Sequence, residues 1–126
     1  MRNAIKAGGA YFAVVFPVAF LVGMVRVLFA APRLGALVAV ALEIPLILAL
    51  SWIACGYILR RIPVRGRGGR LAMGGFAFLV LMVAEAALDL ALGRTLAAHF
   101  AAMGEPAGLL GLAGQAAFGL APLVRR

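Results

Sequence analysis

Four hydrophobic stretches, separated by short groups of Gly, Pro and Arg, dominate the pattern of this chain. They run over about residues 10–31, 35–59, 71–92 and 106–124. Each is close to the roughly 20 apolar residues that a helix needs to cross a bilayer. Each also ends at the Gly, Pro or Arg residues that are typical of helix ends. The pattern predicts one all-α domain over residues 1–126, a membrane-embedded four-helix bundle.

Composition supports a chain that is solvated by lipid. Of its 126 residues, 66% are hydrophobic, whereas soluble domains average about 45–50%. The four stretches use most of the chain, so we expect no soluble domain beside them. The first stretch follows Arg2 and Lys6, but it is too long for a cleaved signal peptide and Arg26 interrupts its end. We therefore expect it to be a mature helix.

The basic residues predict how the bundle is oriented. Arg33 and Arg94 flank the predicted spans on one side, whereas nine of the twelve Lys and Arg residues lie on the other. These nine are Arg2, Lys6, Arg60, Arg61, Arg65, Arg67, Arg70, Arg125 and Arg126. Short loops and termini that are rich in Lys and Arg stay on the cytoplasmic side of a membrane. Both termini and the 60–70 loop are therefore expected in the cytoplasm, with the spans in a bacterial cytoplasmic (inner) membrane and Tyr11 and Tyr57 near its cytoplasmic surface.

The net charge of +8 does not indicate a nucleic-acid partner, because the basic residues gather at the ends of hydrophobic stretches. The segment Arg60–Arg70 holds five arginines and three glycines. Such a segment beside a span attracts anionic lipid headgroups. The expected partners are the lipid bilayer and its anionic headgroups, together with a homo-oligomer or a larger membrane complex.

A few polar residues interrupt the spans, and a charge at bilayer depth is expensive without a partner or a function. Counted from the nearest helix ends, Arg26, Glu43, Glu85 and Gln115 fall at one level in the outer half of the membrane, and Asp89 falls just above it. This coincidence predicts a buried polar layer. Arg26 and Glu43 are opposite in charge and similar in depth, so we expect them to form an ion pair.

The layer is not balanced in charge, because three carboxylates face one guanidinium. Carboxylates that share a site of low dielectric constant hinder one another's ionisation, so we expect at least one to be protonated near neutral pH. Pro17 and Pro45 each remove a helix hydrogen bond near this region. Such helix breaks either expose carbonyl groups to ions or are static kinks filled by neighbouring helices.

Two classes of function stay open. In the first, the layer is a clasp in which Arg26 bonds Glu43 and Gln115 bonds Glu85, and the protein is a structural or accessory bundle. In the second, the carboxylates pass a proton, a small cation or a small solute, with an oligomer enclosing the path. Ser51 is almost the only polar residue below the layer, which counts against an open channel.

Neither an enzyme nor a cofactor is expected. The chain has no metalloprotease, serine-hydrolase or phosphate-loop motif. Cys55 and His99 are the single residues of their types, so no pair has metal-ligand spacing. Cys55 lies within a hydrophobic stretch, where we expect it to be a small packing residue.

Two resemblances follow from size and local pattern. Four spans in a short chain are similar to the small multidrug resistance transporters, but those carry an essential Glu in the first helix and this chain has none there. The stretch Gly23-x-x-Arg26-Val27-Leu28-x-x-x-Pro32-Arg33-x-Gly35, followed by Leu42-Glu43-x-Pro45, resembles small uncharacterised bacterial four-span integral membrane proteins. That resemblance implies no activity, but it implies that these charged residues and prolines belong together.

Overall fold

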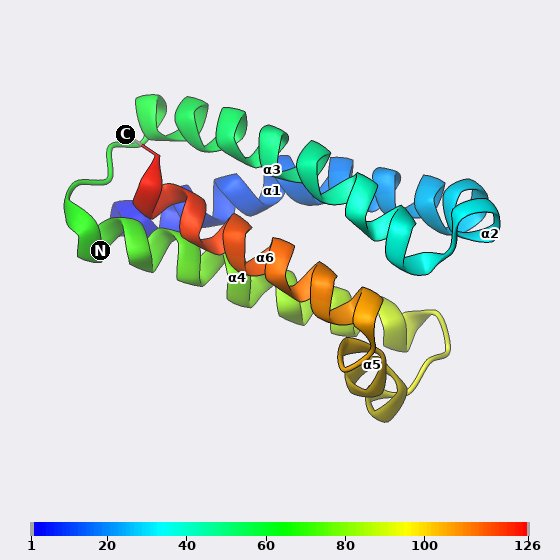
Figure 1. Cartoon of the computed structure of the whole chain (residues 1–126). Helices are drawn as coiled ribbons and strands as arrows, with labels where there is room; N and C mark the ends of the chain where they lie inside the picture. Colours follow the sequence, from blue (N-terminus) through cyan, green and yellow to red (C-terminus); the bar gives the residue numbers. More distant parts are fainter. Residues whose placement is uncertain (1, 126) are drawn as a thin grey trace.

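The computed structural model describes residues 2–125, and this range consists of helices and short connections (Figure 1). Four of the helices, or continuous helical runs, are long and apolar enough to cross a membrane. In chain order the elements are α1 (Arg2–Val25), η1 (Arg26–Ala30), α2 (Ala31–Leu34), α3 (Ala36–Arg61), α4 (Gly66–Ala91), α5 (Leu96–Met103) and α6 (Pro106–Val124). The predicted all-α bundle is therefore confirmed for the described residues.

The helices extend past the hydrophobic stretches at the end that holds both termini. Helix α1 already begins at Arg2, and α4 begins at Gly66 inside the arginine-rich segment. Arg and Lys side chains can lie along a helix and reach water with their charged ends, so a helix need not end where its apolar run ends. Residues 96–103 form the separate short helix α5 rather than a continuation of α4.

The first span departs from regular α-helix at η1, a five-residue π-helical turn. Here the N–H of Ala31 donates to the carbonyl oxygen of Arg26, a spacing of five residues that is typical of π-bulges. Pro17 and Pro45 lie inside α1 and α3, and both helices continue through them. The chain then reverses at Gly35, whose φ of 86° favours glycine.

The four long helices pack in a ring in the order α1, α4, α6 and α3, each against two neighbours. Tyr11 is fully buried at the centre, where its ring stacks on Phe118 at a centroid distance of 4.4 Å. Its hydroxyl donates to the carbonyl oxygen of Phe118 at 2.8 Å. Tyr11 is therefore a core residue that links α1 to α6, not the surface anchor that the sequence suggested. Cys55 is fully buried, as predicted.

Helices α4 and α6 approach closely through glycines. A Cβ atom on Gly74 would overlap the carbonyl oxygen of Gly119, and a Cβ on Gly119 would press on the Cβ of Phe78 at 3.1 Å. Small residues allow this close backbone approach where helices associate in lipid. The contact lies near the Tyr11–Phe118 stack, because Gly119 follows Phe118 directly in α6.

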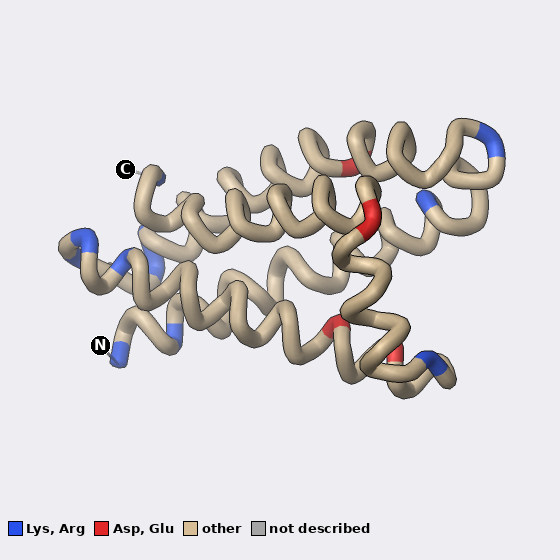
Figure 2. Tube along the Cα trace, turned by 60° about the horizontal axis from the view of Figure 1, so that its bottom comes forward, with Lys and Arg blue, Asp and Glu red and all other residues tan. Residues whose placement is uncertain are grey.

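The bundle opens toward its other end (Figure 1). There, among the described elements, η1 packs against α1, α2 and α3, α2 packs against η1 and α3, and α5 packs against α4 and α6. The charges are distributed unevenly (Figure 2): most basic residues gather near the two termini and the α3–α4 connection, whereas the acidic residues lie in the open half, together with Arg26, Arg33 and Arg94. Arg126, grouped with the basic residues in the sequence, lies outside the described residues.

Replacing Gly74 by Ala should destabilise the bundle by about 1–3 kcal/mol, the usual cost of forcing extra atoms into a packed core. Gly75→Ala is the matched control, because a Cβ atom there meets nothing within 4 Å. Unfolding of both variants in detergent can be followed through the fluorescence of Trp52, the single tryptophan. Equal stability of the two variants would contradict the close α4–α6 contact.

Candidate functional site

The polar residues of the spans are not the buried layer that the sequence predicts. Arg26, Glu43, Glu85, Asp89 and Gln115 are all half-buried, not buried. Among the described residues, the buried polar side chain is that of Ser51, which donates to the carbonyl oxygen of Ile47 within its own helix at 2.7 Å. The expectation of burial fails because the bundle opens at this level, so these side chains lie in separate contacts beside the core.

The first contact joins the hairpin formed by α1 and α3. Arg26 Nε donates to Glu43 Oε2 in an ion pair, and the two side chains are 30% and 16% exposed. Arg26 is the first residue of η1, so the π-helical turn begins at the residue that carries the positive charge. The predicted pairing of these two side chains is thus confirmed, although their environment is only half-buried.

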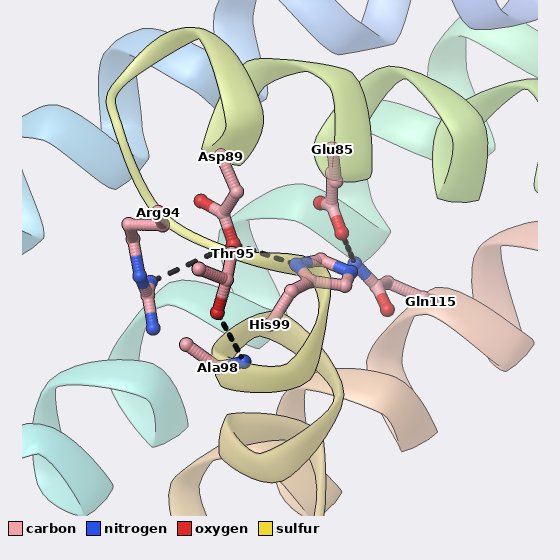
Figure 3. A network of polar contacts seen from close by, with 7 residues as sticks. All are labelled: Glu85, Asp89, Arg94, Thr95, Ala98, His99 and Gln115. Atoms are coloured by element: carbon pink, nitrogen blue, oxygen red, sulfur yellow. Dashed lines mark hydrogen bonds and ion pairs between the residues drawn. The ribbon is translucent and has the colours of Figure 1, made fainter.

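The second contact joins α4 to α6. Gln115 Nε2 donates to Glu85 Oε2 at 2.6 Å (Figure 3). This bond is one of the two that the clasp interpretation of the sequence contains. It lies on the same two helices as the Gly74–Gly119 approach, on the side nearer the open end, so glycine packing and a hydrogen bond together fix how α4 and α6 align.

The third contact fastens α5 to the end of α4, and the sequence did not predict it. His99 Nδ1 lies 2.6 Å from Asp89 Oδ2, and Arg94 Nη1 lies 3.6 Å from the same oxygen (Figure 3). Thr95 begins α5 by accepting a hydrogen bond from the N–H of Ala98 at 3.1 Å. The Thr95 N-cap is the sequence feature that could have predicted this contact, because it starts a new helix that brings His99 back toward Asp89.

The charged side chains of the three contacts are close enough to interact electrostatically. Glu85 interacts electrostatically with His99, Asp89 and Glu43 as well as bonding Gln115. Figure 3 shows His99 between Asp89 and the Glu85–Gln115 bond. The three acidic side chains of these contacts thus lie in the open half of the bundle, where their positive partners are Arg26, Arg94 and, when protonated, His99.

The space beside this cluster is apolar. A shallow groove of about 200 Å³ lies against His99. Its lining residues are Met82, Val83, Ala86, His99, Phe100 and Met103. Within residues 2–125, no group of three or more His, Cys, Asp or Glu side chains could hold a metal ion. The polar contacts can hold helices together and exchange protons between neighbouring side chains. The groove beside them is lined mainly by apolar side chains, so it suits an apolar group better than a water-filled path.

Comparison with protein-family models, with curated proteins and with solved structures finds no match for this chain. Its description as a small four-span membrane protein therefore rests on the four long apolar helices alone.

Replacing Arg26 by Leu should destabilise the protein by about 1–2 kcal/mol, near the upper range for polar contacts between spans. The reason is that Glu43 keeps its charge and loses its partner. Combining Arg26→Leu with Glu43→Gln should recover part of that loss, because the stranded carboxylate is removed. A double-mutant cycle of unfolding in detergent measures both effects. If the two changes simply add, the side chains are not coupled.

Proposed function

We propose that this protein is a structural or accessory four-span membrane protein whose polar contacts hold its helices in one arrangement. One observation carries the proposal: each acidic side chain within a span has a polar partner on another element. Glu43 is held by Arg26, Glu85 by Gln115, and Asp89 by His99. Partnered charges of this kind are expected of a clasp.

The energetic role of such a clasp is specificity more than strength. Polar contacts between spans average only about 0.6 kcal/mol. Apolar helix faces discriminate poorly among neighbours, however, because lipid tails are as apolar as the side chains. Three contacts that each connect a different pair of elements can therefore decide which helices pair and in what register. The proposal assigns no catalytic reaction.

The surface supports a role beside lipid or another membrane protein. Large apolar side chains are exposed along every long helix, including Leu21 at 61%, Ile53 at 67% and Val83 at 62%. In a bilayer these faces contact lipid, a second copy of the chain or a larger complex. A clasp that keeps such a face in a fixed shape suits an accessory or assembly subunit.

The proposed topology places both termini and the α3–α4 connection in the cytoplasm, with residues 1–126 as one domain in a bacterial inner membrane. The gathering of basic residues at that end supports it (Figure 2), because short basic loops stay in the cytoplasm. The α2 turn and α5 then face the opposite side of the membrane.

Single cysteines at Gly68 and Ala98 should test this topology in a Cys55→Ala background. Both positions are exposed, at opposite ends of the bundle. In intact cells, a thiol reagent that cannot cross membranes should label Gly68→Cys only after lysis and Ala98→Cys before it. Labelling in the reverse order would overturn the orientation, and labelling of both before lysis would overturn the four-span topology.

Proton passage is the second candidate, and the position of His99 favours it. His99 contacts Asp89 and lies beside the Glu85–Gln115 bond (Figure 3), so it adds a third titratable group to a series that leads to the open end. A relay needs such groups across the whole membrane. Toward the other end the core is closed by Tyr11 and Met73, both fully buried, and this favours the clasp.

Proton flux into liposomes loaded with a pH-sensitive dye should decide between the two candidates. The clasp predicts that liposomes containing the protein leak no faster than empty ones under an applied potential. A relay predicts flux that Glu85→Gln and His99→Asn each reduce at least tenfold, whereas Glu105→Gln, outside the series, does not. Flux that depends on Glu85 would overturn the clasp as the main function.

A further inference from the structure

The basic end of the bundle contains a pocket that the clasp does not use. It is an open pocket of about 490 Å³ between the start of α4 and the end of α6. Its lining residues are Val64, Arg65, Gly66, Arg67, Arg70 and Leu123. Half of these residues are arginines, so the pocket concentrates positive charge in a defined hollow rather than along a loop.

One wall of the pocket is held in place by hydrogen bonds. Arg70 Nε donates to the carbonyl oxygen of Val64 at 3.1 Å, and Arg70 Nη1 donates to that of Pro122 at 3.3 Å. These bonds tie the α3–α4 connection to the end of α6. Val64 is itself buried, at 6% exposure. Arg70 is thus a structural arginine whose charge is fixed at the pocket, while Arg65 and Arg67 are exposed beside it.

No side-chain carboxylate balances this charge. The four acidic side chains of the chain are Glu43, Glu85, Asp89 and Glu105, and all of them lie in the other half of the bundle (Figure 2). The backbone beside the arginines is also accessible, because Gly66 and Gly68 are exposed and a Cβ atom on either would meet nothing within 4 Å. An anion can therefore approach both the guanidinium groups and the chain.

We propose that this pocket binds the phosphate group of a phosphate monoester, such as the exposed headgroup of an anionic lipid. Guanidinium groups match phosphate oxygens in paired hydrogen bonds. A monoester carries about −1.5 to −2 charges near neutral pH, which suits three arginines better than the single charge of a diester. The lipid form of the ligand rests on the proposed membrane topology, because a headgroup lies at the bilayer surface beside α4 and α6.

The test uses the full chain in a neutral detergent and measures bound ligand by native mass spectrometry. Short-chain phosphatidic acid supplies a monoester headgroup, and phosphatidylglycerol of the same chain length supplies a diester. Arg65→Gln with Arg67→Gln should weaken phosphatidic acid binding at least tenfold, taking about a factor of five for each arginine. Arg60→Gln with Arg61→Gln is the matched control, because it removes the same charge just outside the pocket. The control should change binding less than threefold.

The outcomes separate a site from a diffuse charge effect. Equal losses in the two double variants, or no loss in either, would overturn the pocket. Equal binding of phosphatidic acid and phosphatidylglycerol would overturn the preference for a monoester. Inorganic phosphate that displaces the lipid at equal concentration would support the phosphate site but overturn the lipid as its source. None of these results depends on proton flux or on cysteine labelling, so a failure here is distinct from a failure of the proposed function.

Discussion

A charged or strongly polar side chain at bilayer depth is stable only when another group in the protein replaces the water it has lost. In this chain the partners lie on different elements. Arg26 on η1 pairs with Glu43 on α3, and Glu85 on α4 pairs with Gln115 on α6. The apolar faces around them could pair in many ways at similar cost. The few polar contacts therefore select the arrangement that the larger apolar area then stabilises.

The two halves of the bundle are held by different means. Near the termini, glycine allows backbones to touch: a Cβ on Gly74 would overlap Gly119, and a Cβ on Gly8 would crowd the carbonyl oxygen of Met73. The Tyr11 hydroxyl is satisfied inside this packing by a backbone carbonyl. In the other half the α1–α3 hairpin diverges from α4, α5 and α6 (Figure 1), and directional contacts between side chains act within each group of helices. The open half is consequently the part where a change of charge can most readily alter how the helices sit.

The sequence was sufficient to predict features that depend only on the position of a residue along its helix. Hydrophobic length predicted four long apolar helices, and counting residues from helix ends put Arg26 at the depth of Glu43 and Glu85 at the depth of Gln115. The sequence was insufficient where the outcome depends on the lateral distances between helices in the plane of the membrane. Equal depth does not say how far apart the helices lie, so the predicted burial of this level was wrong. Nor could it predict the Asp89–His99 contact, which requires α5 to fold back against α4.

Most basic residues lie at one end of the bundle and the acidic residues lie in the other half, so the two ends differ in charge. In the proposed topology, the basic groups at one end meet the negative surface potential of the cytoplasmic leaflet, which attracts each nearby Lys or Arg by about 1 kcal/mol. At the other end, Glu85 and Asp89 are satisfied by Gln115 and His99 rather than by lipid. One end is thus built to engage charges outside the protein, and the other to satisfy its charges within it. The hydrophobic helices alone would fit a bilayer either way, so the proposed orientation rests on this asymmetry of charge.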